Sequence, residues 1–165
     1  MDSTLLGALI GAGSAIVGGM LTAAWTNHSS KKRELFLLRN EKREQLYISY
    51  HGMRNATYNF IGLFDGRKFS LSDIEKIDES FNHSNAKIHM LTKIYFNELS
   101  QPHLDTIKSF NIFFNTYISP LCQSFEDKND AIELAKNISN EAFKAYKKAT
   151  SDIDIMISKI EKINI

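Results

Sequence analysis

The side chains best suited to acid–base, nucleophilic or metal chemistry are scattered along this chain. Its five histidines include no His-Glu-x-x-His spacing of the kind that binds zinc. Cys122 is the single cysteine, so it has no second thiol for a zinc site or an intrachain disulfide. Cys122 with His103 as its base would form a nucleophilic pair only if the fold brought the two together. A lone cysteine beside an aromatic helix is more often a packing residue. We therefore expect a protein that is not an enzyme, with no catalytic residue, no metal and no cofactor.

Ligand-binding motifs are equally sparse. No glycine follows Gly66, which argues against a phosphate-binding loop or a dinucleotide-binding turn in the rest of the chain. The aromatic run Phe110 to Tyr117 offers rings for nucleobase stacking, but Lys108 is its only basic neighbour, so we expect core packing instead. The polar patch 82–85 is compatible with a small polar ligand, although we favour a solvated kink.

Charge is concentrated near one segment. Residues 31–43 hold six basic and two acidic side chains, whereas residues 44–165 hold 14 basic and 16 acidic ones. The larger segment therefore lacks the basic surface of a duplex nucleic-acid-binding protein, and we expect no such partner. The basic segment is typical of a sequence that faces anionic lipid headgroups, and a phosphate-bearing ligand is the alternative.

No charged residue lies between Ser3 and Thr26. The central part of this stretch, from Leu5 to Trp25, has about the 20 apolar residues that a helix needs to cross a bilayer. The chain begins Met1-Asp2, without the positive charge that opens a secretory signal peptide, so we expect a retained anchor.

The residues after this stretch predict its orientation. The basic cluster Lys31, Lys32 and Arg33 follows it, and no Lys or Arg precedes it. Positive charges favour the cytoplasmic side, and Trp25 is suited to the membrane interface. We therefore expect a single pass through the inner (cytoplasmic) membrane, with the C-terminal body in the cytoplasm.

Small residues recur on one side of the expected membrane helix. At 100° per residue, this face collects small or hydroxylated side chains. Its members are Thr4, Gly7, Gly11, Ser14, Gly18 and Thr22. Such spacings let helices pack closely in lipid, which predicts a homo-oligomer. The alternative is a plain Gly-rich anchor. If the face lined a pore, that pore would be neutral and narrow and would need several chains.

The remaining residues predict helices joined by short polar links. One apolar seam predicts a helix over about residues 30–64. A second helix is predicted to begin at the capping-box spacing Ser72 to Glu75. A third is predicted to begin near Pro102 and to end near Ile118, before Ser119-Pro120. A fourth runs to about Lys162. The first seam consists of Leu35, Leu38, Lys42, Leu46, Tyr50, Met53, Thr57, Phe60 and Phe64. The fourth helix's seam has nearly strict heptad spacing and consists of Ala131, Ala135, Ile138, Ala142, Ala145, Ala149, Ile153, Met156, Ile160 and Ile163.

These elements predict an all-α protein. We expect residues 1–29 to form a transmembrane helix with its interfacial flank, and residues 30–165 to form a cytoplasmic antiparallel helical bundle. Its partners would be the lipid bilayer, further copies of the chain, and a cytoplasmic ligand or protein.

In layout, the chain resembles small bacterial single-pass membrane effectors of phage-defence systems, for example the channel subunits of Hailong-type systems. The resemblance covers a Gly/Ala-rich helix, the stop after Thr26 that includes Lys31 and Lys32, and a helical body. It implies a self-associating membrane effector or ion channel subunit gated by a cytoplasmic signal in antiviral defence. The alternative is a membrane-anchored scaffold, immunity or superinfection-exclusion protein without a pore.

Overall fold

The computed structural model describes residues 3–62, 70–123 and 128–163, and within these it describes all side chains except those of residues 4–10, 71 and 128–139. Every regular element in the described ranges is helical, which confirms the predicted all-α class. The elements are α1 (Ser3–Ile61), α2 (Leu71–Tyr95), η1 (Asn97–Leu99), α3 (Ser100–Phe113), the π-helical turn η2 (Phe114–Ile118), α4 (Ser119–Gln123) and α5 (Lys128–Glu161). The chain forms two compact units, Met1–Glu41 with Ile165, and Lys42–Asn164.

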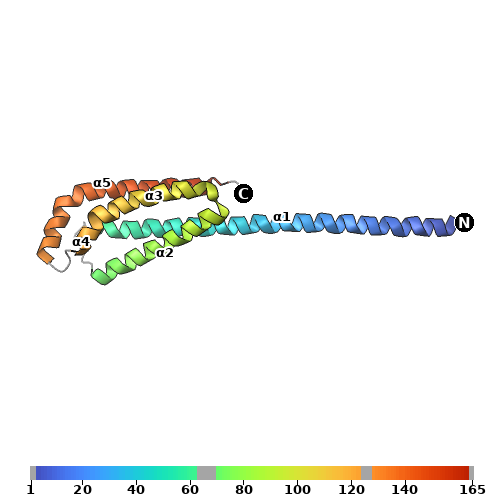
Figure 1. The fold of residues 1–165 in the computed structure, drawn as a ribbon, viewed down its shortest axis with the longest axis horizontal. Helices are drawn as coiled ribbons and strands as arrows, with labels where there is room; N and C mark the ends of the chain where they lie inside the picture. The colour runs from blue at the N-terminus through green and yellow to red at the C-terminus, as the bar shows by residue number, and fades with distance from the viewer. Residues whose placement is uncertain (1–2, 63–69, 124–127, 164–165) are drawn as a thin grey trace. The chain divides into compact units, whose positions relative to one another are not determined.

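The second unit is a helical bundle. Its long helices alternate in direction: residues 42–61 of α1, then α2, then α3 with α4, and finally α5 (Figure 1). The fully described connection is short, since only Phe96 and η1 separate α2 from α3. This is the antiparallel arrangement that short loops favour.

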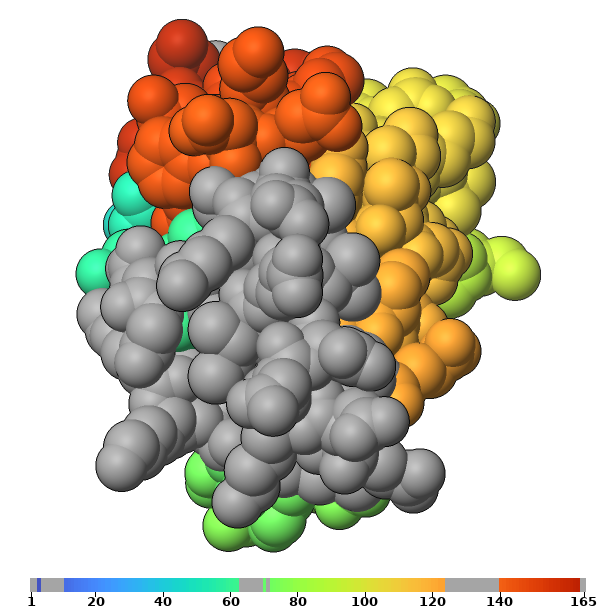
Figure 2. All heavy atoms as spheres, turned by 90° about the vertical axis from the view of Figure 1, so that its left-hand side faces the viewer, coloured from blue at the N-terminus to red at the C-terminus, as the bar shows by residue number. Residues whose placement is uncertain are grey.

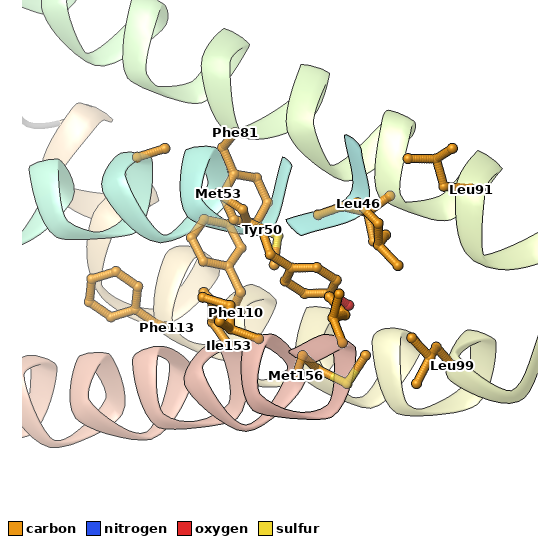
Figure 3. Packing of buried hydrophobic residues seen from close by; sticks show 14 of the residues in the cluster. Leu46, Tyr50, Met53, Phe81, Leu91, Leu99, Phe110, Phe113, Ile153 and Met156 are labelled. Atoms are coloured by element: carbon orange, nitrogen blue, oxygen red, sulfur yellow. The ribbon is translucent and has the colours of Figure 1, made fainter. Parts of the chain in front are cut away.

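One apolar core joins all the long helices of this unit. Figure 3 shows side chains from α1, α2, α3 and α5 converging, among them Tyr50, Phe81, Phe110 and Met156. The rings of Phe81 and Phe110 stack with their centroids 3.5 Å apart. The predicted role of the aromatic run is confirmed, because Phe110 and Phe113 are buried while Phe114 and Tyr117 pack against the core.

The first predicted seam is confirmed within the bundle. Leu46, Tyr50, Met53, Thr57 and Phe60 are all buried. The seam does not stay buried along its whole length, because Leu35 and Leu38 are 66% and 40% exposed. Phe64 lies outside the described residues.

The predicted start of α2 is wrong by two residues. Ser70, not Ser72, is the N-cap: its hydroxyl accepts a hydrogen bond from the Asp73 backbone N–H at 3.2 Å, and its own N–H donates to the Asp73 carboxylate at 3.0 Å. This completes a capping box two residues before the predicted Ser72–Glu75 box.

α2 continues as one helix through residues 82–85, where the sequence predicts a solvated kink. Asn82 is exposed and donates to the Asp78 carboxylate at 3.0 Å. Ser84 instead is buried, and it lies where a side chain at Gly52 of α1 would stand. The polar patch therefore contains a close contact between two helices.

Helical backbone continues past Ser119-Pro120, contrary to the predicted stop. The π-helical turn η2 precedes the proline, and α4 extends to Gln123. Proline lacks the N–H that an α-helix would use, and a wider π turn changes the hydrogen-bond register just before it.

The heptad seam of the last helix is confirmed where side chains are described. Ala142, Ala149, Ile153, Met156 and Ile160 are buried, and Ala145 and Ile163 pack against the core from partly buried positions. The seam positions 131, 135 and 138 lie outside the described side chains.

Candidate functional site

The small-residue face of α1 is the first candidate site. Its described members, Gly11, Ser14, Gly18 and Thr22, are all exposed in the single chain. Ile16, Val17, Met20 and Leu21, which complete this part of the helix, are exposed as well, each by more than half. This stretch therefore offers apolar surface on every side, with a shallow strip where side chains are small.

The strip is open beside its glycines. A Cβ atom placed on Gly11 or Gly18 would meet no atom within 4 Å, and the same holds for Gly13 and Gly19. A larger side chain at any of the four is therefore tolerated by the chain itself. Only a neighbour from outside the chain would distinguish Gly11 and Gly18, which lie on the strip, from Gly13, which lies opposite.

The hydroxyl groups of the strip are used within the helix. Ser14 donates to the Gly11 carbonyl at 2.9 Å, and Thr22 donates to the Gly18 carbonyl at 2.8 Å. Such back-bonding leaves no hydroxyl proton without an acceptor, which suits a surface that faces lipid or a packed neighbour. The lone pairs of the Ser14 and Thr22 hydroxyl oxygens are the side-chain polar groups that this strip presents.

Two of the predicted strip residues, Thr4 and Gly7, lie outside the described side chains, as does the rest of the stretch 4–10. In the part of the chain whose side chains are described, no helix combines the length and the apolar character that a membrane crossing requires.

The predicted interface residues follow on the same helix. Trp25 is 77% exposed, and Lys31, Lys32 and Arg33 are exposed in the next two turns. Their charges therefore stand on an exposed segment of α1 in the first unit.

A buried polar pair lies in the core of the bundle, and sequence reasoning did not identify it. The Tyr50 hydroxyl of α1 lies 3.0 Å from Nδ1 of His103 in the first turn of α3. His103 is 1% exposed, and the exposed His89 of α2 has its ring centroid 6.3 Å away. Burial, and secondly the nearby His89, lowers the pKa of His103 to about 4, while burial raises the pKa of Tyr50. The imidazole is therefore neutral at neutral pH, and the pair forms a hydrogen bond within the core.

The hypothetical Cys122–His103 pair is not formed. His103 lies in the first turn of α3, and Cys122 lies in α4, at the other end of the bundle (Figure 1). Helix of that length spans roughly 25–30 Å. Burial is the main reason that the pKa of the Cys122 thiol is raised, which disfavours the reactive thiolate.

A shallow groove separates α3 and η2 from α5, and the described parts of α3 and α5 lie side by side in an end-on view (Figure 2). Its lining includes Ile112, Lys144 and Lys148. At its far end Asp152 accepts a hydrogen bond from Ser109 at 2.6 Å and pairs with Lys148 at 3.5 Å. The Ser109–Asp152 hydrogen bond therefore joins α3 to α5 beside the groove.

No metal-binding group of three or more His, Cys, Asp or Glu side chains occurs among the described residues. Comparison of the chain with protein-family models, with curated proteins and with solved structures found no match.

Proposed function

We propose that this chain is a self-associating membrane effector, in which the N-terminal part of α1 enters the bilayer and packs against the same helix of other copies. The observation that carries the proposal is the exposed strip from Gly11 to Thr22, with open space beside its glycines and its hydroxyls bonded to their own helix. It lies within the uncharged stretch from Ser3 to Thr26.

Close packing of small residues would supply the free energy of helix association, because lipid provides no hydrophobic driving force for it. Lipid tails are as apolar as leucine, so helices associate in a bilayer through close van der Waals contact. Glycine permits that contact because it brings the backbones together. The face opposite the strip, which includes Gly13 and Met20, would remain in contact with lipid.

A pore is the most specific form of this effector. Several copies would surround an opening lined by Ser14 and Thr22 oxygens, without any charged group of the stretch Ser3–Thr26. A signal sensed by the bundle has a direct route to such a pore, because α1 continues as one helix from Ser3 to Ile61. The layout shared with defence-system channels suggests antiviral defence as its setting.

The test is the mass of the detergent-solubilised full chain, measured by light scattering with correction for bound detergent. We expect a closed oligomer of at least three copies. Gly11→Leu and Gly18→Leu should reduce it to monomers, because leucine separates the backbones. Gly13→Leu is the matched control: it meets equally open space in the chain but lies opposite the strip.

Each outcome has a defined meaning. A monomeric wild-type chain, or oligomers that survive Gly11→Leu and Gly18→Leu together, overturns self-association through the strip. Oligomers that respond to the variants but give no conductance in planar bilayers overturn the pore. That result would favour the alternative of a membrane-anchored scaffold.

A further inference from the structure

Two basic residues lie on the same side of α1 as the small-residue strip, beyond its C-terminal end. The line through Gly11 and Gly18 runs along the middle of the strip. At 100° per residue, Lys32 is turned about 50° to one side of this line and Arg33 about 50° to the other. Both side chains are exposed. The strip therefore has a basic residue on each of its two flanks where α1 continues beyond it.

The chain itself does not neutralise the charges of this pair. The stretch from Ser3 to Arg33 contains no Asp or Glu, and Glu34 is turned about 160° from Lys32. In the part of the chain whose side chains are described, neither Lys32 nor Arg33 forms an ion pair. As far as Arg33, the charge on the strip's side of α1 is therefore positive only.

Packing through the strip would bring these charges together. When parallel helices pack through the same side, one flank of each helix faces the opposite flank of its neighbour. Lys32 of one copy would then face Arg33 of the next, and like charges so placed weaken association. An anion between them would make the contact attractive. A phosphate group suits this position, because it accepts paired hydrogen bonds from a guanidinium and a further one from an ammonium.

We infer that Lys32 and Arg33 of neighbouring copies bind a phosphate group between them, and that this anion strengthens the oligomer. The inference rests on the proposed function, because the two side chains meet only if the chain associates through the strip. Lipid headgroups and free inorganic phosphate both carry such a group. Trp25, about two turns before the pair, is suited to the membrane interface, where lipid phosphates lie.

The test measures the mass of the detergent-solubilised full chain by light scattering over a range of protein concentrations. Relative to chloride at equal ionic strength, inorganic phosphate should lower the concentration for half-assembly roughly three- to tenfold. Phosphatidylglycerol added in chloride should do the same, whereas phosphatidylcholine, whose headgroup has no net charge, should not. A response to phosphatidylglycerol alone assigns the site to lipid, and a response to inorganic phosphate alone assigns it to a free anion. No response to either overturns the inference.

Removing the charges tests the residues themselves. In chloride, Lys32→Gln and Arg33→Gln should assemble at lower protein concentration than wild type, because the repulsion is gone, and they should respond little to phosphate. Lys31→Gln is the matched control: it removes the same charge from the opposite side of α1, at the angle of Gly13 about five turns earlier. It should behave as wild type does. A full phosphate response in the variants of the pair, or its loss in Lys31→Gln, contradicts the assignment.

These results separate the phosphate site from the proposed function. An oligomer that Gly11→Leu dissociates, but that phosphate and Lys32→Gln leave unchanged, refutes the phosphate site and leaves the proposed function standing. A chain that stays monomeric with phosphate, with phosphatidylglycerol and after Lys32→Gln refutes association through the strip, and the phosphate site with it.

Discussion

Single side chains set how closely the helices of the bundle approach. Gly52 of α1 faces Ser84 of α2, and a Cβ atom at Gly52 would stand 2.8 Å from the serine Oγ. Nearby, Tyr50 of α1 and His103 of α3 form a hydrogen bond within the core. Both contacts join helices, and each depends on one atom of a polar side chain.

Gly52→Ala should therefore destabilise the bundle by about 1 kcal/mol. The added methyl gains about 1 kcal/mol of helix propensity, but overpacking in a tight contact costs about 1–3 kcal/mol. In the double variant with Ser84→Ala the Oγ is gone, and stability should recover to or above that of Ser84→Ala alone. Thermal and urea unfolding followed by circular dichroism measure both effects. A Gly52→Ala chain more stable than wild type would show that α2 yields easily at this contact.

The buried histidine predicts a pH dependence of stability. The pKa of His103 is about 4 in the fold, below its ordinary value of 6.5, so the unfolded chain binds the proton more readily. Neutral His103 contributes fully to the free energy of unfolding above about pH 6.5. This contribution, roughly 3 kcal/mol in total, is lost as the pH falls toward 4.

His103→Asn isolates this contribution from that of the carboxyl groups. The asparagine side-chain oxygen can still accept a hydrogen bond from the Tyr50 hydroxyl, but the amide group does not titrate. The free energy of unfolding, measured between pH 4 and 7, should fall less steeply for the variant than for wild type. Equal slopes would mean that His103 titrates normally in the folded chain.

At the scale of the element, the caps decide where helices begin. Ser70→Ala should cost about 1 kcal/mol, because it removes the acceptor for the Asp73 backbone N–H. Ser72→Ala is the matched control: it removes an exposed hydroxyl within the first turn of α2 and should change stability by less than about 0.5 kcal/mol. The reverse ranking in chemical unfolding would assign the cap to Ser72.

The elements show which features the sequence could predict. The seam of α5 followed from periodicity because one face of that helix is buried from Ala142 to Ile160. The start of α2 was misplaced because two overlapping segments, Ser70–Asp73 and Ser72–Glu75, share the capping-box spacing. Backbone geometry alone distinguishes them.

Contacts between helices were beyond sequence reasoning for a physical reason. Ser84 is polar and stands among polar residues, and its burial depends on the absence of a side chain at Gly52, on another helix. The Tyr50–His103 pair likewise joins residues whose separation along the chain has no periodic meaning. Exposed Leu35 and Leu38 are the converse: they continue a seam by spacing, but the single chain leaves them uncovered.

At the scale of the whole molecule, the two units differ in how their apolar side chains are buried. The first carries exposed apolar side chains from Ile16 to Leu38, whereas the second has a buried apolar core and also exposes large apolar side chains such as Ile94 and Ile112. The second unit has an apolar core to which all its long helices contribute. The exposed apolar surface of the first unit is the part of the molecule on which the proposed function rests.

Replacing residues 5–24 by a leucine-rich helix without glycine therefore separates an effector from a scaffold. The replacement would keep the proposed membrane anchor and leave the second unit unchanged, but it removes the small-residue strip. We expect the variant to stay in the membrane fraction and to lose any depolarisation that the wild-type chain causes when expressed in bacteria, as followed by a potential-sensitive dye. Gly13→Leu in the natural helix is the control and should depolarise as wild type does. A leucine-rich variant with full activity would show that the helix serves only as an anchor and that function resides on the surface of the bundle.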